Sequence, residues 1–345
     1  MMKGLVVTTD HRAELKNISL PSPGPFEALV KILACGICST TDSELIRGTQ
    51  PNNSEYPCLL GHEGIGEVIQ IGANVKYFKT GDWVTRPAGI LPGTTRDGLT
   101  SAWGGFAEYG LVTDYKALAE SGSKAMLNDY TALRQNVLTN GPQVGLAASV
   151  LSIALAETLD WSEKLSMANS TVCVNGTGIA GLSLVLWAKL AGASKVIALG
   201  RRTERLALAK ELGADELINI SDKTGIDEVK ALSNGGVDVF MEATGVASQM
   251  EVAIRSLKPG GTVGVYGVAT DNIYKLDWRW FPPDIRFMMH EPQEHLARAR
   301  VIDLIAKGKI PVEKLMTHNW PLDDFQQAFD AVQAGKVVKA MLIIA

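Results

Sequence analysis

The 345-residue chain has few cysteines and no long apolar run, and each shortage excludes a class of protein. Four cysteines are too few for a disulfide scaffold in a chain of this length. No run approaches the roughly 18 apolar residues of a membrane span. The first residues are typical of a β-strand rather than of a signal peptide. We therefore expect a cytoplasmic protein with no membrane partner.

The chain also lacks a strong charge of either sign. Its formal net charge of −4 gives no support for binding to nucleic acid or to an anionic membrane. Apolar residues make up 46% and charged residues 20%, as in ordinary soluble globular proteins. The length favours two domains over one.

The pattern along the chain changes near Val144. The first part is β-rich and punctuated by glycine, with predicted strands at 3–8, 27–34, 66–71 and 82–85. An apolar helix is expected over 146–158. Strands at 171–175, 195–199, 237–242 and 262–266 then alternate with helices at 179–191, 203–212 and 247–257. This alternation predicts an α/β fold with a doubly wound parallel sheet of the Rossmann type. The tail returns to mixed elements, with helices near 294–307 and 322–334 and a strand at 338–344.

A glycine-rich turn follows the first strand of this alternating region. It reads Gly176, Thr177, Gly178, Ile179, Ala180, Gly181, and a helix begins at once. In such a turn the first glycine permits the tight bend, the second lets the backbone approach a pyrophosphate, and the third allows close helix–strand packing. The phosphates would lie on the helix N-terminus. The segment predicts a dinucleotide site.

The end of the next strand indicates which dinucleotide is bound. An NAD site usually has Asp or Glu there, to hold the ribose 2′-hydroxyl. Here Leu199 is followed by Gly200, Arg201 and Arg202. No carboxylate repels an extra phosphate, and two guanidinium groups can bind it. NADP(H) is therefore favoured over NAD(H); the alternative is that the arginines are a solvated start of a helix.

A second group of residues suits a metal ion. Cys38 follows a predicted strand, and His62, beside Glu63, comes 24 residues later. Zinc accepts sulfur, nitrogen and oxygen ligands, and a catalytic zinc has three protein ligands with one open position. A ligand histidine also needs a partner for its other ring nitrogen, for which Asp42 is the candidate.

These segments resemble the medium-chain dehydrogenase/reductase superfamily, in its zinc-dependent alcohol and polyol dehydrogenase branch. The resemblance runs nearly end to end. It rests on CGICSTTD (35–42), GHEGIGEVIQIGANVKYFKTGDWV (61–84), GGFAEY (104–109), VCVNGTGIAG (172–181), DVFMEATG (238–245) and LKPGGTVGVYG (257–267). It implies a GroES-like catalytic domain over 1–150, completed by 290–345, and a Rossmann dinucleotide-binding domain over 151–289.

The resemblance also implies roles for individual residues. Cys38, His62 and Glu63 match the ligands of a single catalytic zinc, and Asp42 matches the aspartate behind the ligand histidine. A Ser or Thr near the ligand cysteine usually relays the substrate proton; here this is Thr40 or Thr41, of which Thr41 is favoured because it precedes Asp42. Further cofactor contacts are expected from Thr244, Val265 and Gly267.

The expected activity is the interconversion of a small-molecule alcohol, secondary or polyol-like, and a carbonyl compound by hydride transfer. The four closely spaced cysteines of the family's structural zinc are absent, so no structural zinc is expected. A homodimer or homotetramer is implied, in which a strand near 285–289 joins two sheets. Trp278, Trp280 and Phe281 precede that strand and are expected in the core or at the subunit interface.

One departure from the family leaves alternatives open. Ser149 stands where the family usually has a further zinc ligand, and a neutral serine is a poor one. Gln143 or Glu157 would substitute if the alignment is shifted. A metal-free NADPH-dependent reductase of enones or quinones is therefore the main rival, and an inactive nucleotide-binding protein is another. Arg86 is expected to be a surface or structural arginine, with contact to a polar substrate as the alternative.

Overall fold

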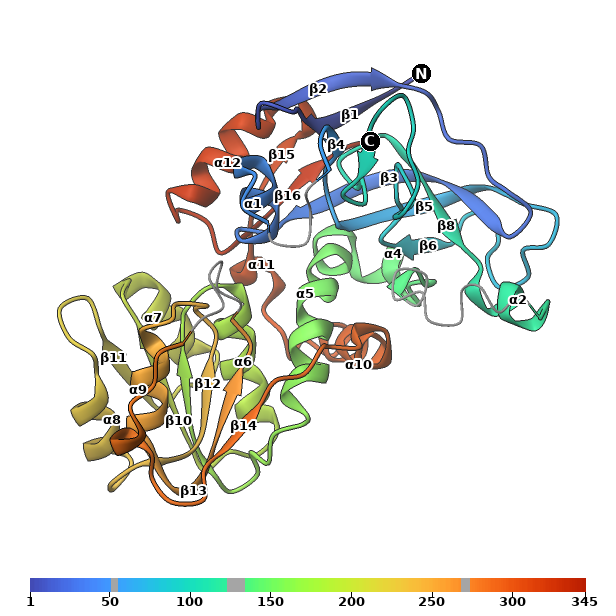
Figure 1. Cartoon of the computed structure of the whole chain (residues 1–345). Helices are drawn as coiled ribbons and strands as arrows, with labels where there is room; N and C mark the ends of the chain where they lie inside the picture. Colours follow the sequence, from blue (N-terminus) through green and yellow to red (C-terminus); the bar gives the residue numbers. More distant parts are fainter. Residues whose placement is uncertain (51–54, 123–133, 268–273) are drawn as a thin grey trace. The chain divides into compact units, whose positions relative to one another are not determined.

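The computed structural model describes residues 1–50, 55–122, 134–267 and 274–345. The chain forms two compact units, of which unit 1 comprises Met1–Ile153 and Arg298–Ala345, and unit 2 comprises Ala154–Ala297. Figure 1 shows that the C-terminal residues return to the N-terminal unit. In the described part of the chain, no helix combines the length and the apolar character needed to cross a membrane.

Unit 1 is built on two sheets. The smaller sheet has the strand order β2 (Ala13–Ile18), β1 (Met2–Val7), β4 (Cys58–Leu59), β7 (Thr100–Ser101). The larger has the order β15 (Met316–Pro321), β16 (Lys339–Ile343), β3 (Glu27–Ile37), β5 (Glu63–Ile71), β6 (Trp83–Thr85), and β8 (Tyr109–Thr113) also pairs with β3. Apolar side chains of both sheets are buried, so each sheet has a face in the core.

Short helices complete unit 1. They are α1 (Thr41–Arg47), α2 (Tyr115–Glu120), α4 (Gly141–Val144), α11 (Val312–Leu315), the 3₁₀ turn η3 (Leu322–Asp324) and α12 (Phe325–Gln333). Two helices, α5 (Leu146–Ser162) and α10 (Glu294–Ala306), run across the boundaries between the units. The pairing of β16 with β3 places the last strand of the chain beside the strand that leads to Cys38.

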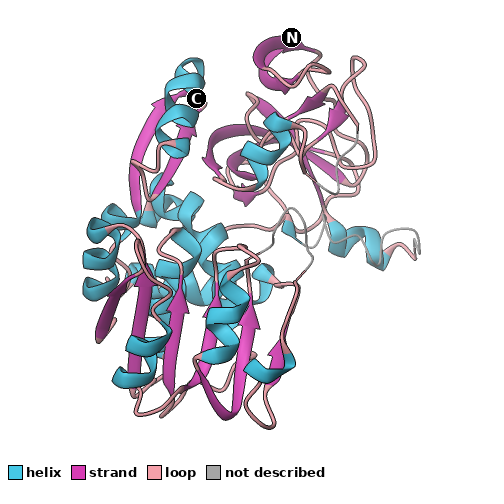
Figure 2. Cartoon of the chain, turned by 60° about the vertical axis from the view of Figure 1, so that its left-hand side comes forward, coloured by secondary structure: helices cyan, strands magenta, loops and turns pink. Residues whose placement is uncertain are grey.

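Unit 2 contains a six-stranded sheet in which every pair of neighbours is parallel. Its order is β11 (Glu216–Asn219), β10 (Lys195–Gly200), β9 (Thr171–Asn175), β12 (Val237–Glu242), β13 (Leu257–Val265), β14 (Arg286–Met288). The helices are α6 (Ile179–Leu190), α7 (Thr203–Glu211), α8 (Ile226–Leu232), α9 (Gln249–Arg255) and the 3₁₀ turn η2 (Trp278–Trp280). Figure 2 shows the strands side by side with helices packed around them. The α/β fold class predicted from the sequence is confirmed.

The structure corrects three details of the sequence prediction. Strand β13 begins at Leu257 rather than at 262, and α9 ends at Arg255, because the pairing of β12 with β13 continues past a shift in register. Trp278, Trp280 and Phe281 were expected in the core or at a subunit interface. A core position is wrong for Trp278, which is 82% exposed, whereas Trp280 and Phe281 pack against the core of unit 2.

Candidate functional site

Two strand ends of the larger sheet in unit 1 bring the three predicted metal ligands together. Cys38 follows the last residue of β3, and Glu63, preceded by His62, is the first residue of β5. In the antiparallel register of these strands Gly36 lies opposite Glu63. Cys38 and His62, which are 24 residues apart in the chain, therefore lie close together because β3 and β5 are paired neighbours.

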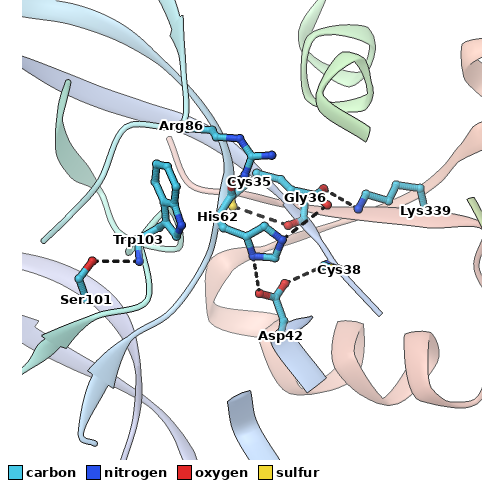
Figure 3. A network of polar contacts seen from close by, with 10 residues as sticks. Cys35, Gly36, Cys38, Asp42, His62, Arg86, Ser101, Trp103 and Lys339 are labelled. Carbon is cyan, nitrogen blue, oxygen red and sulfur yellow. Dashed lines mark hydrogen bonds and ion pairs between the residues drawn. The ribbon is translucent and has the colours of Figure 1, made fainter. Parts of the chain in front are cut away.

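The ligand atoms of Cys38, His62 and Glu63 lie within 4.8 Å of one another. His62 Nε2 is 3.9 Å from Glu63 Oε1, and Figure 3 shows the other side of the imidazole facing Asp42. The side chains of His62 and Glu63 are 15% and 7% exposed. One sulfur, one imidazole nitrogen and one carboxylate oxygen form a ligand set that fits a zinc ion with one open position.

Asp42 connects the cysteine and the histidine. It lies in the first turn of α1 and is fully buried. Its Oδ2 accepts a hydrogen bond of 2.8 Å from the backbone N–H of Cys38, and its Oδ1 lies 3.1 Å from His62 Nδ1. A proton on Nδ1, shared with Asp42, leaves Nε2 free to bind a metal ion. The sequence analysis selected Asp42 for this position.

The protein's own charges favour the thiolate of Cys38, which is its ligand form, but the protonated form of His62. Burial opposes the thiolate of Cys38, but the hydrogen bond and charge of His62 outweigh it and lower the pKa of the thiol. Burial likewise opposes the imidazolium, yet the charge of Asp42 and its hydrogen bond raise the pKa of His62 to about 10. The imidazolium of His62 thus compensates the negative charges of Cys38, Asp42 and Glu63. A metal cation can take over this role by displacing the proton of His62.

Lys339 is a site residue that the sequence analysis missed. It is the first residue of β16, is 3% exposed, and its Nζ lies 2.5 Å from Glu63 Oε2 (Figure 3). Burial lowers the pKa of this lysine, but the charges of Glu63 and Cys38 outweigh it and raise the pKa. The signal in the sequence was a single lysine inside an otherwise apolar strand, VVKAMLII.

Gly36 makes the room that Glu63 occupies. A Cβ atom on Gly36 would lie 2.4 Å from Glu63 Oε2 and 3.0 Å from Val150 Cγ1. Glu63 Oε2 is buried, and among the described residues its partner is the ammonium group of Lys339, with no further hydrogen-bond donor. The carboxylate is thus confined beside His62, with acceptor capacity that a metal ion can use.

The two candidate hydroxyl groups for proton relay lie at the start of α1. Thr40 is the exposed N-cap residue, and its side chain makes no capping hydrogen bond. Thr41 is the first residue of the helix and is half-buried. Thr41 directly precedes Asp42 in the helix, and Thr40 lies one position earlier, at its N-cap.

Ser149 is buried in α5 with its hydroxyl turned to the backbone. Its Oγ donates toward the carbonyl oxygens of Gly145, at 2.8 Å, and Gly141, at 3.2 Å. The group of potential metal ligands found among the described residues includes neither Glu157 nor any residue of α5. Gln143 is exposed in α4.

Arg86 lies beside the histidine. It is 2% exposed, its backbone φ is +53°, and its Nη1 donates to the carbonyl oxygen of His62. Its guanidinium carbon lies 5.6 Å from the ring centre of Trp103, another residue with positive φ (Figure 3). Arg86 is therefore a buried arginine that holds the His62 backbone, which agrees with the structural rather than the surface form of the expectation.

In unit 2 the glycine-rich turn has the local geometry of a phosphate-binding loop. Gly176 follows β9 with φ of +116°, and Thr177 leads to Gly178, the N-cap of α6, which starts at Ile179 and Ala180. The first N–H groups of a helix have no partner within it and point to where an anion can bind. A Cβ on Gly181 would lie 1.9 Å from Gly176 O, whereas one on Gly178 would meet nothing within 4 Å.

The predicted 2′-phosphate residues stand at the end of β10. Gly200 is its last residue, and a Cβ there would lie 2.7 Å from Thr177 Oγ1, so the glycine admits Thr177 rather than leaving open space. Arg201 and Arg202 are both exposed. A third arginine, Arg205, is buried in α7, where burial and the charge of Arg202 lower its pKa. Residues 201–205 thus carry three guanidinium groups and one carboxylate, that of Glu204.

The remaining predicted cofactor residues gather around a buried carboxylate. Glu242, at the end of β12, accepts hydrogen bonds from the backbone N–H and the hydroxyl of Thr244. Val265 pairs with Glu242 at the end of β13, and the N–H of Gly267 donates to the Glu242 carbonyl oxygen. Burial raises the pKa of Glu242. The sequence analysis missed this residue, which shapes the loop that carries Thr244.

Comparison with known proteins gives matches in both units. The family model "Alcohol dehydrogenase GroES-like domain" matches residues 24–121, and "Zinc-binding dehydrogenase" matches residues 180–283. L-threonine 3-dehydrogenase of Pyrococcus furiosus is 28% identical over 97% of this chain and 96% of its own length. NADP-dependent isopropanol dehydrogenase of Thermoanaerobacter brockii is 28% identical over 100% of both chains.

A solved structure resembles the whole chain. It is a putative zinc-binding dehydrogenase from Sinorhizobium meliloti 1021 bound to NADP, with a TM-score of 0.78 and 28% identity over 100% of this chain and 99% of that one. The resemblance extends over both units, so it accounts for the β-rich unit as well as for the parallel sheet.

Proposed function

Because the chain belongs to the zinc-type medium-chain alcohol dehydrogenases, which are NAD(P)-dependent oxidoreductases, we propose that it interconverts a secondary alcohol and a ketone with NADP(H). Unit 1 is the catalytic unit in this proposal, and unit 2 binds the dinucleotide. The observation that carries it is the convergence of Cys38, His62 and Glu63 within 4.8 Å. A metal-free reductase has no need of this ligand set.

In the proposal one zinc ion is held by Cys38, His62 and Glu63. When bound, zinc polarises the substrate oxygen and stabilises negative charge that develops on it. Asp42 holds the ring of His62 through Nδ1 at 3.1 Å and so keeps Nε2 directed at the metal. The four cysteines of the whole chain do not supply a structural zinc site, so one zinc per subunit is expected.

The substrate proton leaves through a hydroxyl at the start of α1. We assign this role to Thr41 Oγ1, because Thr41 is half-buried beside Asp42, whereas Thr40 is exposed. A bound NADP(H) would supply or accept the hydride through its nicotinamide ring, which is chemistry of the cofactor. Thr244, Val265 and Gly267, around the buried Glu242, position the nicotinamide end of the dinucleotide in this assignment.

NADP(H) is proposed over NAD(H) on the basis of charge. Gly200 is followed by two exposed arginines and not by the Asp or Glu that an NAD site usually has there. Arg205 adds a third positive charge. A guanidinium binds a phosphate through two parallel hydrogen bonds. Two of the similar proteins are named for NADP dependence or for bound NADP.

The substrate class follows from two of the relatives. Threonine and isopropanol, the compounds in their names, both carry a secondary hydroxyl group. The choice among secondary alcohols and polyols is a matter for a substrate screen, with NADP⁺ for oxidation of the alcohols and NADPH for reduction of the carbonyl compounds.

The chain is proposed to be a homo-oligomer. Strand β14 lies at the edge of the parallel sheet of unit 2, and Phe287 and Met289 on and beside it are 48% and 71% exposed. Trp278, 82% exposed, packs on Phe281 nearby. An exposed apolar edge of this kind can pair with the same edge of a second copy. Light scattering of the wild type and of Phe287→Lys tests this, because the substitution is expected to yield monomers.

The central test is the zinc content of the purified protein, measured by elemental mass spectrometry and followed by assay with secondary alcohols and NADP⁺. We expect about one zinc per subunit, as the family's catalytic sites hold. Cys38→Ser should lose zinc and alcohol oxidation while NADPH binding persists. The matched control is Cys173→Ala, a buried cysteine of unit 2, which should keep both. Zinc-free protein that resists reconstitution and reduces enones would favour the metal-free reductase instead.

A further inference from the structure

Lys339 is a buried cation that the proposed reaction does not use. It is 3% exposed, and its Nζ lies 2.5 Å from Glu63 Oε2. Placing an ammonium group in the interior costs several kcal/mol unless a partner of opposite charge compensates it. The β16–β3 register fixes the position, because Ala340 pairs with Ile37 and the preceding Lys339 therefore stands at the level of Cys38. The lysine is thus built into the wall of the metal site.

The two oxygens of Glu63 face different cations. Oε1 lies 3.9 Å from His62 Nε2, on the side of the proposed metal ligands, and Oε2 lies against Lys339. The carboxylate cannot move away on the side of Gly36, where even a Cβ atom would come within 2.4 Å. Arg86 adds a further positive charge that acts on Glu63. One carboxylate would therefore be shared between a bound metal ion and the Lys339 ammonium group.

We propose that Lys339 competes with the metal ion for Glu63 and so keeps the metal site weaker than its three ligands alone would make it. This inference rests on the proposed function. A positive charge beside a divalent cation opposes its binding, and a carboxylate already paired with an ammonium group is a poorer ligand. Lys339 is a positioning residue in this account: it acts through Glu63 and touches no reacting atom.

A purely supporting role for Lys339 predicts the opposite sign. Groups that orient a metal ligand usually strengthen the site, and their removal lowers metal affinity by about 10–100-fold. Removal of a competing cation instead raises the affinity, because Oε2 of the buried carboxylate loses the ammonium group paired with it and a metal ion can replace that charge. The sign of the change in zinc affinity therefore decides between the two roles.

The experiment measures zinc affinity of the full-length chain by competition with a chelator at fixed pH. Lys339→Met, which keeps the length of the side chain and removes its charge, should bind zinc at least about tenfold more tightly, the size of effect that neighbours of metal ligands have. Lys339→Arg, which keeps the charge, should stay within about threefold of the wild type by the same scale. In a Glu63→Gln background the effect of Lys339→Met should largely disappear, because the two side chains act on each other.

Thermal unfolding supplies an independent readout. Without zinc, Lys339→Met should be less stable than the wild type, because the buried Glu63 carboxylate loses the ammonium group that pairs with its Oε2. Zinc should then raise its unfolding temperature by more than it raises that of the wild type. Should the zinc-free Lys339→Met protein fail to fold, Lys339→Gln removes the charge and keeps a hydrogen-bond donor for Glu63.

Two failures are distinguishable. If the wild type binds zinc and both Lys339→Met and Lys339→Gln bind it with unchanged or lower affinity, this inference is overturned and the proposed function stands. A wild-type protein that binds no zinc, with Cys38→Ser indistinguishable from it, overturns the proposed function and this inference together.

Discussion

The substitution Gly178→Ala separates cofactor binding from folding. Gly178 has φ of −75° and ψ of −179°, which alanine adopts without strain, and an added Cβ would meet no atom within 4 Å. Alanine is less favourable than glycine at a helix N-cap by up to roughly 1 kcal/mol, but it also lowers the entropy of the unfolded chain, which offsets about 0.4–1 kcal/mol. The unfolding temperature should therefore change by no more than about 4 °C.

The same methyl group should weaken dinucleotide binding strongly. The second glycine of such a turn lets the backbone approach the pyrophosphate, and the space that Cβ would fill is where we place the phosphates. An increase of at least about tenfold in the Kd for NADPH, equivalent to about 1.4 kcal/mol, is expected. Titration of NADPH fluorescence, with thermal unfolding of the same sample, measures both quantities.

Gly181→Ala is the matched comparison. Its Cβ would lie 1.9 Å from Gly176 O and 2.7 Å from Gly176 C, both backbone atoms that cannot move aside cheaply. Overpacking of this kind typically costs about 1–3 kcal/mol or more, so this variant should lose stability and cofactor binding together. If Gly178→Ala bound NADPH as tightly as the wild type, the turn would not approach the pyrophosphate at Gly178, and the cofactor assignment in unit 2 would be wrong there.

Three further outcomes are expected. Arg201→Ala should raise the Kd for NADPH by about 10–100-fold, as loss of a charge-assisted hydrogen bond does, and the Kd for NADH far less; equal losses in binding assays would refute the 2′-phosphate assignment. Gly36→Ala should lower zinc affinity by at least about tenfold by displacing Glu63, while Gly64→Ala, whose Cβ would have only ordinary contacts of 3.4 Å and longer, should not. Because the pKa of His62 is about 10, zinc must displace its proton at lower pH; zinc affinity should fall about tenfold for each unit of pH from about 9 to about 7, and a constant affinity would contradict the proposed ligation.

Much of the fold was predictable from local pattern. The strands Thr171–Asn175 and Val237–Glu242 were predicted with the observed bounds, because short apolar runs between turn residues mark buried parallel strands. The boundary between α9 and β13 was not, since a β-bulge in the pairing with β12 decides where that strand begins. The exposure of Trp278 was also missed. A cluster of aromatic residues such as Trp278, Trp280 and Phe281 usually indicates a buried core, and only the tertiary structure shows that Trp278 lies outside it.

The sequence by itself determined the chemistry available to this protein. The spacing of Cys38, Asp42 and His62 and the glycines from 176 to 181 are local or nearly local signals, and their residue types limit what they can bind. Only the tertiary structure decided that Lys339 lies against Glu63, 276 positions away in the chain, and that Gly36 confines that carboxylate. The reason is physical: the register of β16 on β3 and of β3 on β5 brings these groups together, and register is a property of the assembled sheet rather than of any one strand.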